Sequence, residues 1–412
     1  MLKFGFRHNN FYPIMLLIFI FLRIFMDTLL KFHPYKNYTD FIIPFLIFSS
    51  QSLIGYLIHL YYYKKNILEK KNNNPPAKIG SITLITNKTY ANRDNKIKRW
   101  SLMIFASFFN FIGSIIRSDD VINFGTKEEN NSLLEIRVRS IQIIISSLLC
   151  YYALKFNIYK HQKLSLYIIS FFLLVIIIVE FYISINIPYK IFALFFSSMS
   201  CLFRSFLDVS EKYLFDYNYV NILKMMIYEG LIGLFLYLIY FFSNKSYQNH
   251  GIYFINDIKG FDWDLISFLL LIILYLIISG FRNAYRVTTN KYYSPMSRAL
   301  FESTFDPLLF LYNTLTFNRK DEYKGFWIYF SIVLFCLTII AFFSLVYNDF
   351  IILYCCGLQH NTYSEIISRL YFQQSNQNGS ICENNQGSFD NSGEKESVVI
   401  ELKDQYLIQL KG

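Results

Sequence analysis

Charged side chains that recur at helical spacing inside an apolar stretch are the feature of this sequence best suited to chemistry. Arg298, Glu302 and Asp306 follow one another every four residues, so on a helix they form one polar stripe. An ionisable group in hydrocarbon costs roughly 2.5–3.5 kcal/mol, which makes such a stripe intolerable on a lipid-facing surface. We therefore expect it either to line a water-filled cavity or to form buried ion pairs between helices. In a cavity, Glu302 or Asp306 could bind a proton or a cation.

A second polar group begins the apolar stretch at residues 136–156. It consists of Glu135, Arg137, Arg139 and Gln142. The planar guanidinium of arginine donates two parallel hydrogen bonds, which suits phosphate and carboxylate groups. These four residues and the stripe together form the predicted binding site for a small polar or anionic solute.

Two further pairs of opposite charge stand four residues apart, Arg23 with Asp27 and Arg204 with Asp208. Residues at this spacing lie on one helix face, where opposite charges neutralise each other. The simplest role for both pairs is structural: they make membrane insertion tolerable or hold helices together.

Other charges inside apolar stretches have simpler explanations by position. Glu180 comes late in its stretch and is expected to reach the outer membrane interface, whereas Arg282 and Arg286 are expected to mark a cytosolic helix end. Glu229 lies well inside its apolar stretch, and the free-energy cost of placing an ionisable group in hydrocarbon makes it a functional candidate.

These charges need helices to position them, and the composition predicts helices that span a membrane. Of the 412 residues, 54% are hydrophobic and only 17% charged, against roughly 25% charged in soluble domains. Several apolar stretches approach the roughly 20 residues that cross about 30 Å of hydrocarbon, and in lipid such stretches must be helical. We predict an all-α membrane protein with about ten transmembrane helices, at residues 11–31, 41–63, 100–117, 136–156, 163–187, 189–213, 220–243, 263–286, 296–316 and 325–350.

The distribution of lysine and arginine predicts the orientation. The segment 64–99 contains ten basic residues against Glu69 and Asp94, so it is expected to be a flexible cytosolic loop. With ten helices both termini are then cytosolic, and the polar segment 355–412 is a largely disordered cytosolic tail. The net charge of +10 is attributed to such loops, and no nucleic-acid partner is expected.

An internal repeat is the most informative pattern in the chain. Arg, Phe, Asp and Lys coincide when the first and sixth predicted helices are aligned, and two further helix pairs match in the same order. The matching segments are 23–31 with 204–212, 51–55 with 229–233, and 133–139 with 300–306. Each half then holds five helices, residues 1–187 and 188–354. Because five is odd, the halves cross the membrane in opposite senses, as in many transporters.

Ten helices arranged as five plus five resemble the drug/metabolite transporter superfamily, in particular its eukaryotic solute-carrier branch, which includes nucleotide-sugar transporters. Three motifs carry the resemblance: the run DVSEKYL from Asp208, the run YEG from Tyr228, and the run NDFII from Asn348. It covers residues 11 to about 354 and implies a carrier whose substrate is a nucleotide sugar or a related metabolite.

No motif indicates an enzyme. The chain lacks a Walker loop, an HExxH pair and a glycine-rich dinucleotide loop, and its six cysteines lack metal-type spacing. No catalytic residue, metal or cofactor is therefore expected.

We expect a secondary transporter that moves a small polar or anionic organic solute by alternating access. Its expected partners are that solute and the lipid bilayer of an endomembrane or the plasma membrane, with a homodimer left open. The alternative is a non-transporting membrane scaffold or receptor that acts through the loop at 64–99 and the tail at 355–412.

Overall fold

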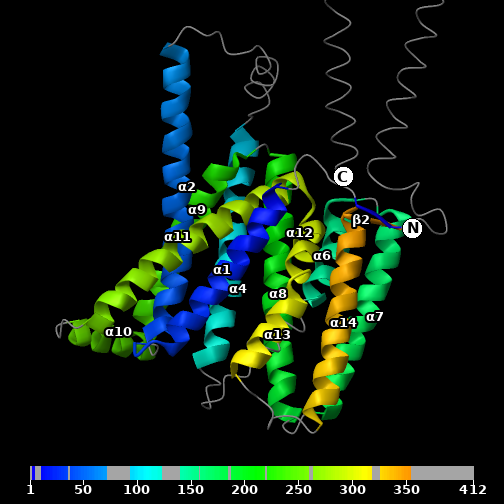
Figure 1. The fold of residues 1–412 in the computed structure, drawn as a ribbon. Helices are drawn as coiled ribbons and strands as arrows, with labels where there is room; N and C mark the ends of the chain where they lie inside the picture. The colour runs from blue at the N-terminus through cyan, green and yellow to red at the C-terminus, as the bar shows by residue number, and fades with distance from the viewer. Residues whose placement is uncertain are drawn as a thin grey trace, which may run out of the picture.

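A computed structural model describes residues 2–4, 11–35, 38–71, 93–122, 140–156, 158–183, 187–218, 220–258, 263–317 and 325–353. Helices make up nearly all of this part (Figure 1). They are α1 (Phe11–Phe32), α2 (Thr39–Lys71), α4 (Arg93–Ile122), α6 (Ser140–Ala153), α7 (Lys160–Ile183), α8 (Ile187–Asp216), α9 (Ile222–Ser243), α10 (Lys245–Ile258), α11 (Trp263–Tyr292), α12 (Pro295–Ser303), α13 (Asp306–Phe317) and α14 (Phe326–Tyr347).

Seven of the described helices are long and apolar enough to cross a membrane: α1, α2, α4, α7, α9, α11 and α14. Their surfaces carry many exposed large apolar side chains, such as Tyr167 and Phe171 on α7 and Phe335 on α14. Hydrocarbon is the solvent that suits such surfaces. The chain is therefore an integral, multi-pass, α-helical membrane protein.

Each of the ten predicted helices has a counterpart, but three differ from a simple apolar span. α6 has only 14 residues, and α8 carries several charges in its second half. The ninth predicted helix is divided into α12 and α13 by a turn at Thr304 and Phe305. Pro307 lies in the first turn of α13; its nitrogen has no hydrogen to donate to Ser303, which favours a helix end there.

The predicted boundaries and connections need two corrections. α2 continues to Lys71 and α4 begins at Arg93, so both helices extend into the segment expected to be a flexible loop. α10 occupies Lys245–Ile258, where the polar sequence predicts a connection rather than a helix. The tail at 355–412 lies outside the described residues.

α8 lies in the middle of the bundle, in contact with α4, α6, α11 and α12. Figure 1 shows α7 and α14 side by side at one edge, where they pack together, and α2 against α9 towards the opposite edge. The apolar core between α6, α7, α12 and α14 contains Leu300, Leu337 and Ile340, all fully buried. This arrangement buries the charged residues Asp208, Glu211 and Lys212 of α8 within protein.

Two short strands, one at the beginning and one at the end of the described chain, pair with each other. β1 (Leu2–Phe4) pairs antiparallel with β2 (Ile351–Leu353), and Lys3 stands opposite Ile352. Residues 2–4 and the segment after α14 therefore lie at the same end of the bundle.

Candidate functional site

Asp208 of α8 is the meeting point of three other helices. Its carboxylate accepts a hydrogen bond from Arg286 Nη1 of α11 at 3.3 Å and from Gln142 Nε2 of α6 at 3.2 Å. Arg298 of α12 donates to the same carboxylate through Nη2. Asp208 is only 1% exposed, so its charge depends on these partners rather than on water.

Arg286 connects this point to a second group of carboxylates. Its Nη2 lies 2.6 Å from Glu211 Oε1, also on α8, and 3.1 Å from Glu229 Oε2 on α9. One guanidinium thus contacts three carboxylates on two helices. Asn290, one turn further along α11, donates to Glu211 Oε2 at 2.8 Å and to the backbone carbonyl of Asp208 at 2.8 Å.

The network continues into the first half of the chain through two amides. Gln51 of α2 donates through Nε2 to Glu229 Oε2 at 2.6 Å, and Asn110 of α4 donates to Gln51 Oε1 at 3.3 Å. Side chains from seven of the described helices, α2, α4, α6, α8, α9, α11 and α12, are therefore joined into one buried polar network. Removing one partner from such a network leaves another polar group unpaired, which costs more than the bond itself contributes.

The short helix α12 holds two members of the network in position. Ser294 caps its first turn by accepting a hydrogen bond from Ser297 N at 3.0 Å, and Pro295 starts the helix where no backbone donor is required. One turn apart on this helix, Arg298 Nη1 donates to Glu302 Oε1 at 2.6 Å. Arg282 of α11 approaches the same oxygen at 4.0 Å.

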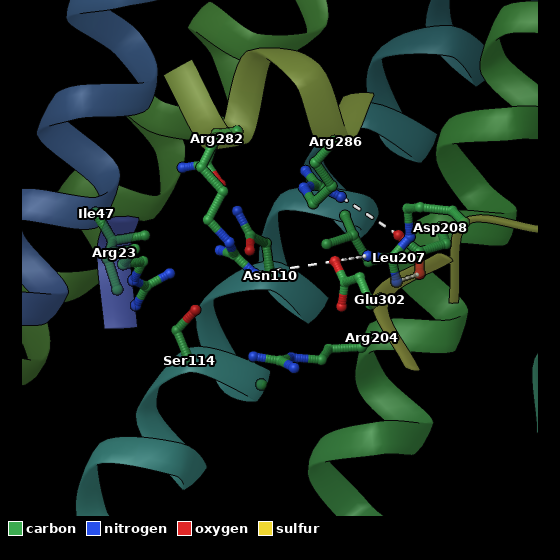
Figure 2. A pocket seen from close by; sticks show the side chains of 13 residues that line it. Arg23, Ile47, Asn110, Ser114, Arg204, Leu207, Asp208, Arg282, Arg286 and Glu302 are labelled. Atoms are coloured by element: carbon green, nitrogen blue, oxygen red, sulfur yellow. Dashed lines mark hydrogen bonds and ion pairs between the residues drawn. The ribbon is translucent and has the colours of Figure 1, made fainter. Parts of the chain in front are cut away.

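A cavity of about 60 Å³ lies beside this network (Figure 2). Five arginines and two carboxylates line it: Arg23, Arg204, Arg282, Arg286 and Arg298, with Asp208 and Glu302. Its remaining lining residues are Ile47, Asn110, Gly113, Ser114, Leu207 and Asn283. The volume is sufficient for a few water molecules or a small polar group, and its walls carry more positive than negative charge.

Two buried hydrogen-bond donors in the cavity wall lack an acceptor among the described residues. They are Arg298 Nε and Asn283 Nδ2, in side chains of residues only 3% and 4% exposed. A buried donor without an acceptor costs about 1–3 kcal/mol, more when it is charged. Water or an anionic group within the cavity would remove that cost.

The structure brings part of the predicted solute site together. Arg298 and Glu302 line the cavity and are also paired with each other, so the two alternatives for the stripe, cavity lining and ion pairing, both hold for them. Asp306 is fully buried at the start of α13 and is not among the lining residues. Gln142 binds Asp208. Glu135, Arg137 and Arg139 lie outside the described residues.

The two predicted charge pairs differ from each other. Arg23 and Asp27 approach to 3.9 Å on α1, and Arg23 Nε also donates to the hydroxyl of Tyr275 at 3.1 Å. Asp208 binds cations from α11 and α12, so its role extends beyond its own helix. Arg204 lines the cavity together with Arg23.

The structure adds to one prediction about position and overturns another. Glu180, expected at the membrane interface, is 3% exposed, and its Oε2 accepts a hydrogen bond from the hydroxyl of Tyr329 at 2.6 Å. Arg286 does not mark a helix end, because α11 continues to Tyr292 and Arg286 is buried in the network.

Sequence reasoning missed the amides of the network, Gln51, Asn110 and Asn290. Their signal was an uncharged amide inside an apolar stretch, which is easily overlooked beside full charges, although a buried amide also needs partners. Among the described residues no cluster of three or more histidine, cysteine, aspartate or glutamate side chains is arranged to hold a metal ion.

Comparison of the sequence with models of known protein families and with curated proteins finds no match. What can be inferred about function therefore depends on the cavity and on the network around it.

Proposed function

We propose that this membrane protein is a secondary transporter that binds a small anionic organic solute in the arginine-lined cavity and moves it by alternating access. The observation that carries the proposal is the cavity wall itself. Five guanidinium groups face two carboxylates, and two buried donors, Arg298 Nε and Asn283 Nδ2, have no acceptor among the described residues. An anionic group fits this excess of positive charge and free donors.

The position of the cavity supports a transporter. Its lining residues come from α1, α2 and α4 in the first half of the chain and from α8, α11 and α12 in the second. Transporters built from inverted repeats bind substrate at the junction of the repeats. The broken helix α12–α13 ends its first part just after Glu302, and discontinuous helices are common at such sites.

Contacts between α2 and α9 support the inverted repeat. The sequence match places Gln51 opposite Glu229 and Ser52 opposite Gly230, at a separation of 178 residues. Each of these residues touches its own counterpart: Gln51 donates to Glu229, and a Cβ added to Gly230 would lie 2.5 Å from Ser52 N. Self-contacts of this kind arise close to a two-fold axis.

Two further contacts between α2 and α9 are also related to each other by the 178-residue separation. A Cβ added at Gly55 would meet Met226, and one added at Gly233 would meet Phe48. Adding the same 178-residue separation to Gly55 gives Gly233, and adding it to Phe48 gives Met226. The first contact is therefore the counterpart of the second.

Helix packing supports a two-fold relation between the two halves of the chain over the whole bundle. If the halves correspond in order, α1 corresponds to α8 and α4 to α11. The contact between α4 and α8 then corresponds to the contact between α11 and α1. In the same way, the contact between α4 and α9 corresponds to the contact between α11 and α2. α2 packs on α9 and α7 on α14, which are pairs of equivalent helices.

Two features of the helix bundle fit ten membrane crossings better than seven. α8 has 30 residues, about 45 Å of helix, and its charged residues Asp208, Glu211 and Lys212 are buried among neighbouring helices rather than exposed to lipid. Residues 2–4 and 351–353 are paired at one end of the bundle, as an even number of crossings requires. Such a plan resembles the drug/metabolite transporter superfamily.

Flux through proteoliposomes tests the proposal. Purified protein is reconstituted and assayed with a panel of radiolabelled anions: inorganic phosphate, glucose 6-phosphate, malate and UDP-glucose. Asn283→Ala and Arg204→Gln, which alter the cavity wall, should raise the KM for a transported anion about tenfold or more, as expected for loss of a hydrogen bond to a charged group.

A matched control separates local from general effects of charge. Lys163→Gln removes a positive charge from an exposed position on α7, away from the cavity, and should leave the KM unchanged. Absence of flux for the whole panel, with a soluble partner retained by the segments 64–99 or 355–412, would instead favour the scaffold or receptor alternative.

A further inference from the structure

Two glutamates compete for one guanidinium nitrogen behind the cavity. Glu211 Oε1 lies 2.6 Å and Glu229 Oε2 lies 3.1 Å from Arg286 Nη2, and both glutamates are fully buried. They come from different helices, α8 and α9, and neither lines the cavity. Arg286 does line it, so this residue connects the glutamate pair to the proposed anion site.

The charges in contact with the glutamate pair do not balance if both of its carboxyl groups are ionised. Among the described residues, Glu211 and Glu229 share one cation, the guanidinium of Arg286, and that guanidinium also binds Asp208. Arg298 of the cavity wall is bound to Asp208 and Glu302 instead. Uncompensated negative charge in a dry interior is costly, and buried carboxyl groups relieve that cost by taking up a proton.

The nitrogen that the two glutamates share shows where a proton would be held. Glu211 Oε1 and Glu229 Oε2 lie against the same Arg286 Nη2, at 2.6 and 3.1 Å, so the two carboxyl groups are close neighbours. Glu229 Oε1 is buried and receives no hydrogen bond from the described residues. Two carboxyl groups can bond to each other only when one of them is protonated, because an ionised carboxylate is solely an acceptor.

We propose that the Glu211–Glu229 pair is a proton-binding site and that the transporter moves its anion together with a proton. This inference rests on the proposed transport function. The proton enters the pair from water on one side of the membrane and leaves to water on the other. No covalent bond other than the O–H bond forms or breaks.

Arg286 provides the coupling between proton and anion. When the pair is protonated, the guanidinium is neutralised by fewer carboxylates and contributes more positive charge to the cavity, so an anion binds more tightly. When the pair is ionised, it competes with the anion for Arg286. By linkage, a bound anion strengthens proton binding to the same extent that the proton strengthens anion binding.

The groups facing the pair come from every helix packed around it. Lys212 is turned away: its Nζ donates to the carbonyl of Lys291 at 2.8 Å and lies 3.3 Å from Asp216. α2 and α4 present the uncharged Gln51 and Asn110. The charged groups in contact with the pair or with its partners are Asp208 on α8, Arg286 on α11 and, through Asp208, Arg298 on α12.

Infrared spectroscopy of the purified full-length protein tests the proton site without a transport assay. A protonated carboxyl group gives a C=O band that an ionised one lacks and that shifts in D2O. We expect such a band near neutral pH in the wild-type protein, its loss in Glu229→Gln and Glu211→Gln, and its retention in Glu180→Gln. The last variant alters another buried carboxyl group, on α7.

The outcomes are distinct. A wild-type spectrum without the band, or a band unaffected by both pair variants, overturns the proposal. The wild-type spectrum is recorded without any variant, so poor folding of a variant does not remove the test.

Proteoliposomes that contain a pH-sensitive dye then test the coupling. Each of the four anions of the flux panel is added outside, at a pH where its ionisation is constant. A transported anion should acidify the lumen, and Glu229→Gln should abolish the acidification while anion exchange continues. A transported anion that moves without a proton overturns the coupling. If no anion moves but the infrared band is present, the transport function fails and the proton site stands.

Discussion

Gln51 and Glu229 hydrogen-bond to each other between α2 and α9, with Gln51 Nε2 donating to Glu229 Oε2 at 2.6 Å. They are also the two positions that the sequence repeat aligns. The two positions differ in charge: Gln51 supplies an amide donor, and Glu229 supplies the carboxyl group that accepts. The bond therefore joins α2 to α9 and holds the glutamate that lies next to Arg286.

Replacing the amide tests this junction. Gln51→Leu leaves Glu229 without its amide donor and Asn110 without its acceptor, and should lower the free energy of unfolding by about 1–3 kcal/mol. Thermal or denaturant unfolding in detergent measures the loss. In a double-mutant cycle with Glu229→Gln, the two effects should be non-additive; additive effects would show that the two residues act independently.

Close packing of α2 on α9 gives a second prediction. A side chain at Gly230 would collide with the backbone of Ser52, so Gly230→Ala should destabilise the protein by about 1–3 kcal/mol. Gly113→Ala is the matched control, because its nearest neighbour would be at 3.5 Å, an ordinary contact. The fraction of monodisperse protein that survives heating in detergent compares the two, and equal survival would contradict the close approach.

Loss of the guanidinium shared by three carboxylates should be severe. Arg286→Gln leaves Asp208, Glu211 and Glu229 without that cation, and removing one partner of a buried ion pair costs about 3–5 kcal/mol. Arg282→Gln removes a cation that stands 4.0 Å from Glu302 and should cost less. Yield and melting temperature in detergent check the order of the two variants, and a milder effect for Arg286→Gln would be inconsistent with the network.

Topology distinguishes ten crossings from seven. Because ten is even, tags at the N-terminus and after residue 353 should lie on the same side of the membrane, in line with the pairing of β1 and β2. Seven crossings would place them on opposite sides. Labelling single cysteines with a membrane-impermeant maleimide in intact and opened vesicles decides between these outcomes.

The contact between α7 and α14 provides a test outside the cavity. Tyr329→Phe removes the hydroxyl that donates to the buried carboxyl group of Glu180 and should lower the stability by about 1–3 kcal/mol. Anion flux per folded molecule should not change, because neither residue lines the cavity. Loss of flux without loss of stability would imply a role for this pair in transport.

The sequence by itself determined that the protein is helical and membrane-embedded, because the length and composition of an apolar stretch are local properties and hydrocarbon admits few backbone structures. It also identified Arg298, Glu302, Asp208 and Glu229 as costly charges. The division of the ninth helix could be anticipated from Pro307, since the effect of proline on a helix is local.

Only the tertiary structure decided which of these charges meet. The position of Arg286 predicts a helix end, yet Arg286 binds carboxylates on α8 and α9, 57 to 78 residues away in sequence. Such partnerships depend on which helices pack together and on how each is rotated. Helical periodicity fixes neither of these, because a polar face can turn towards any neighbour that supplies the opposite charge.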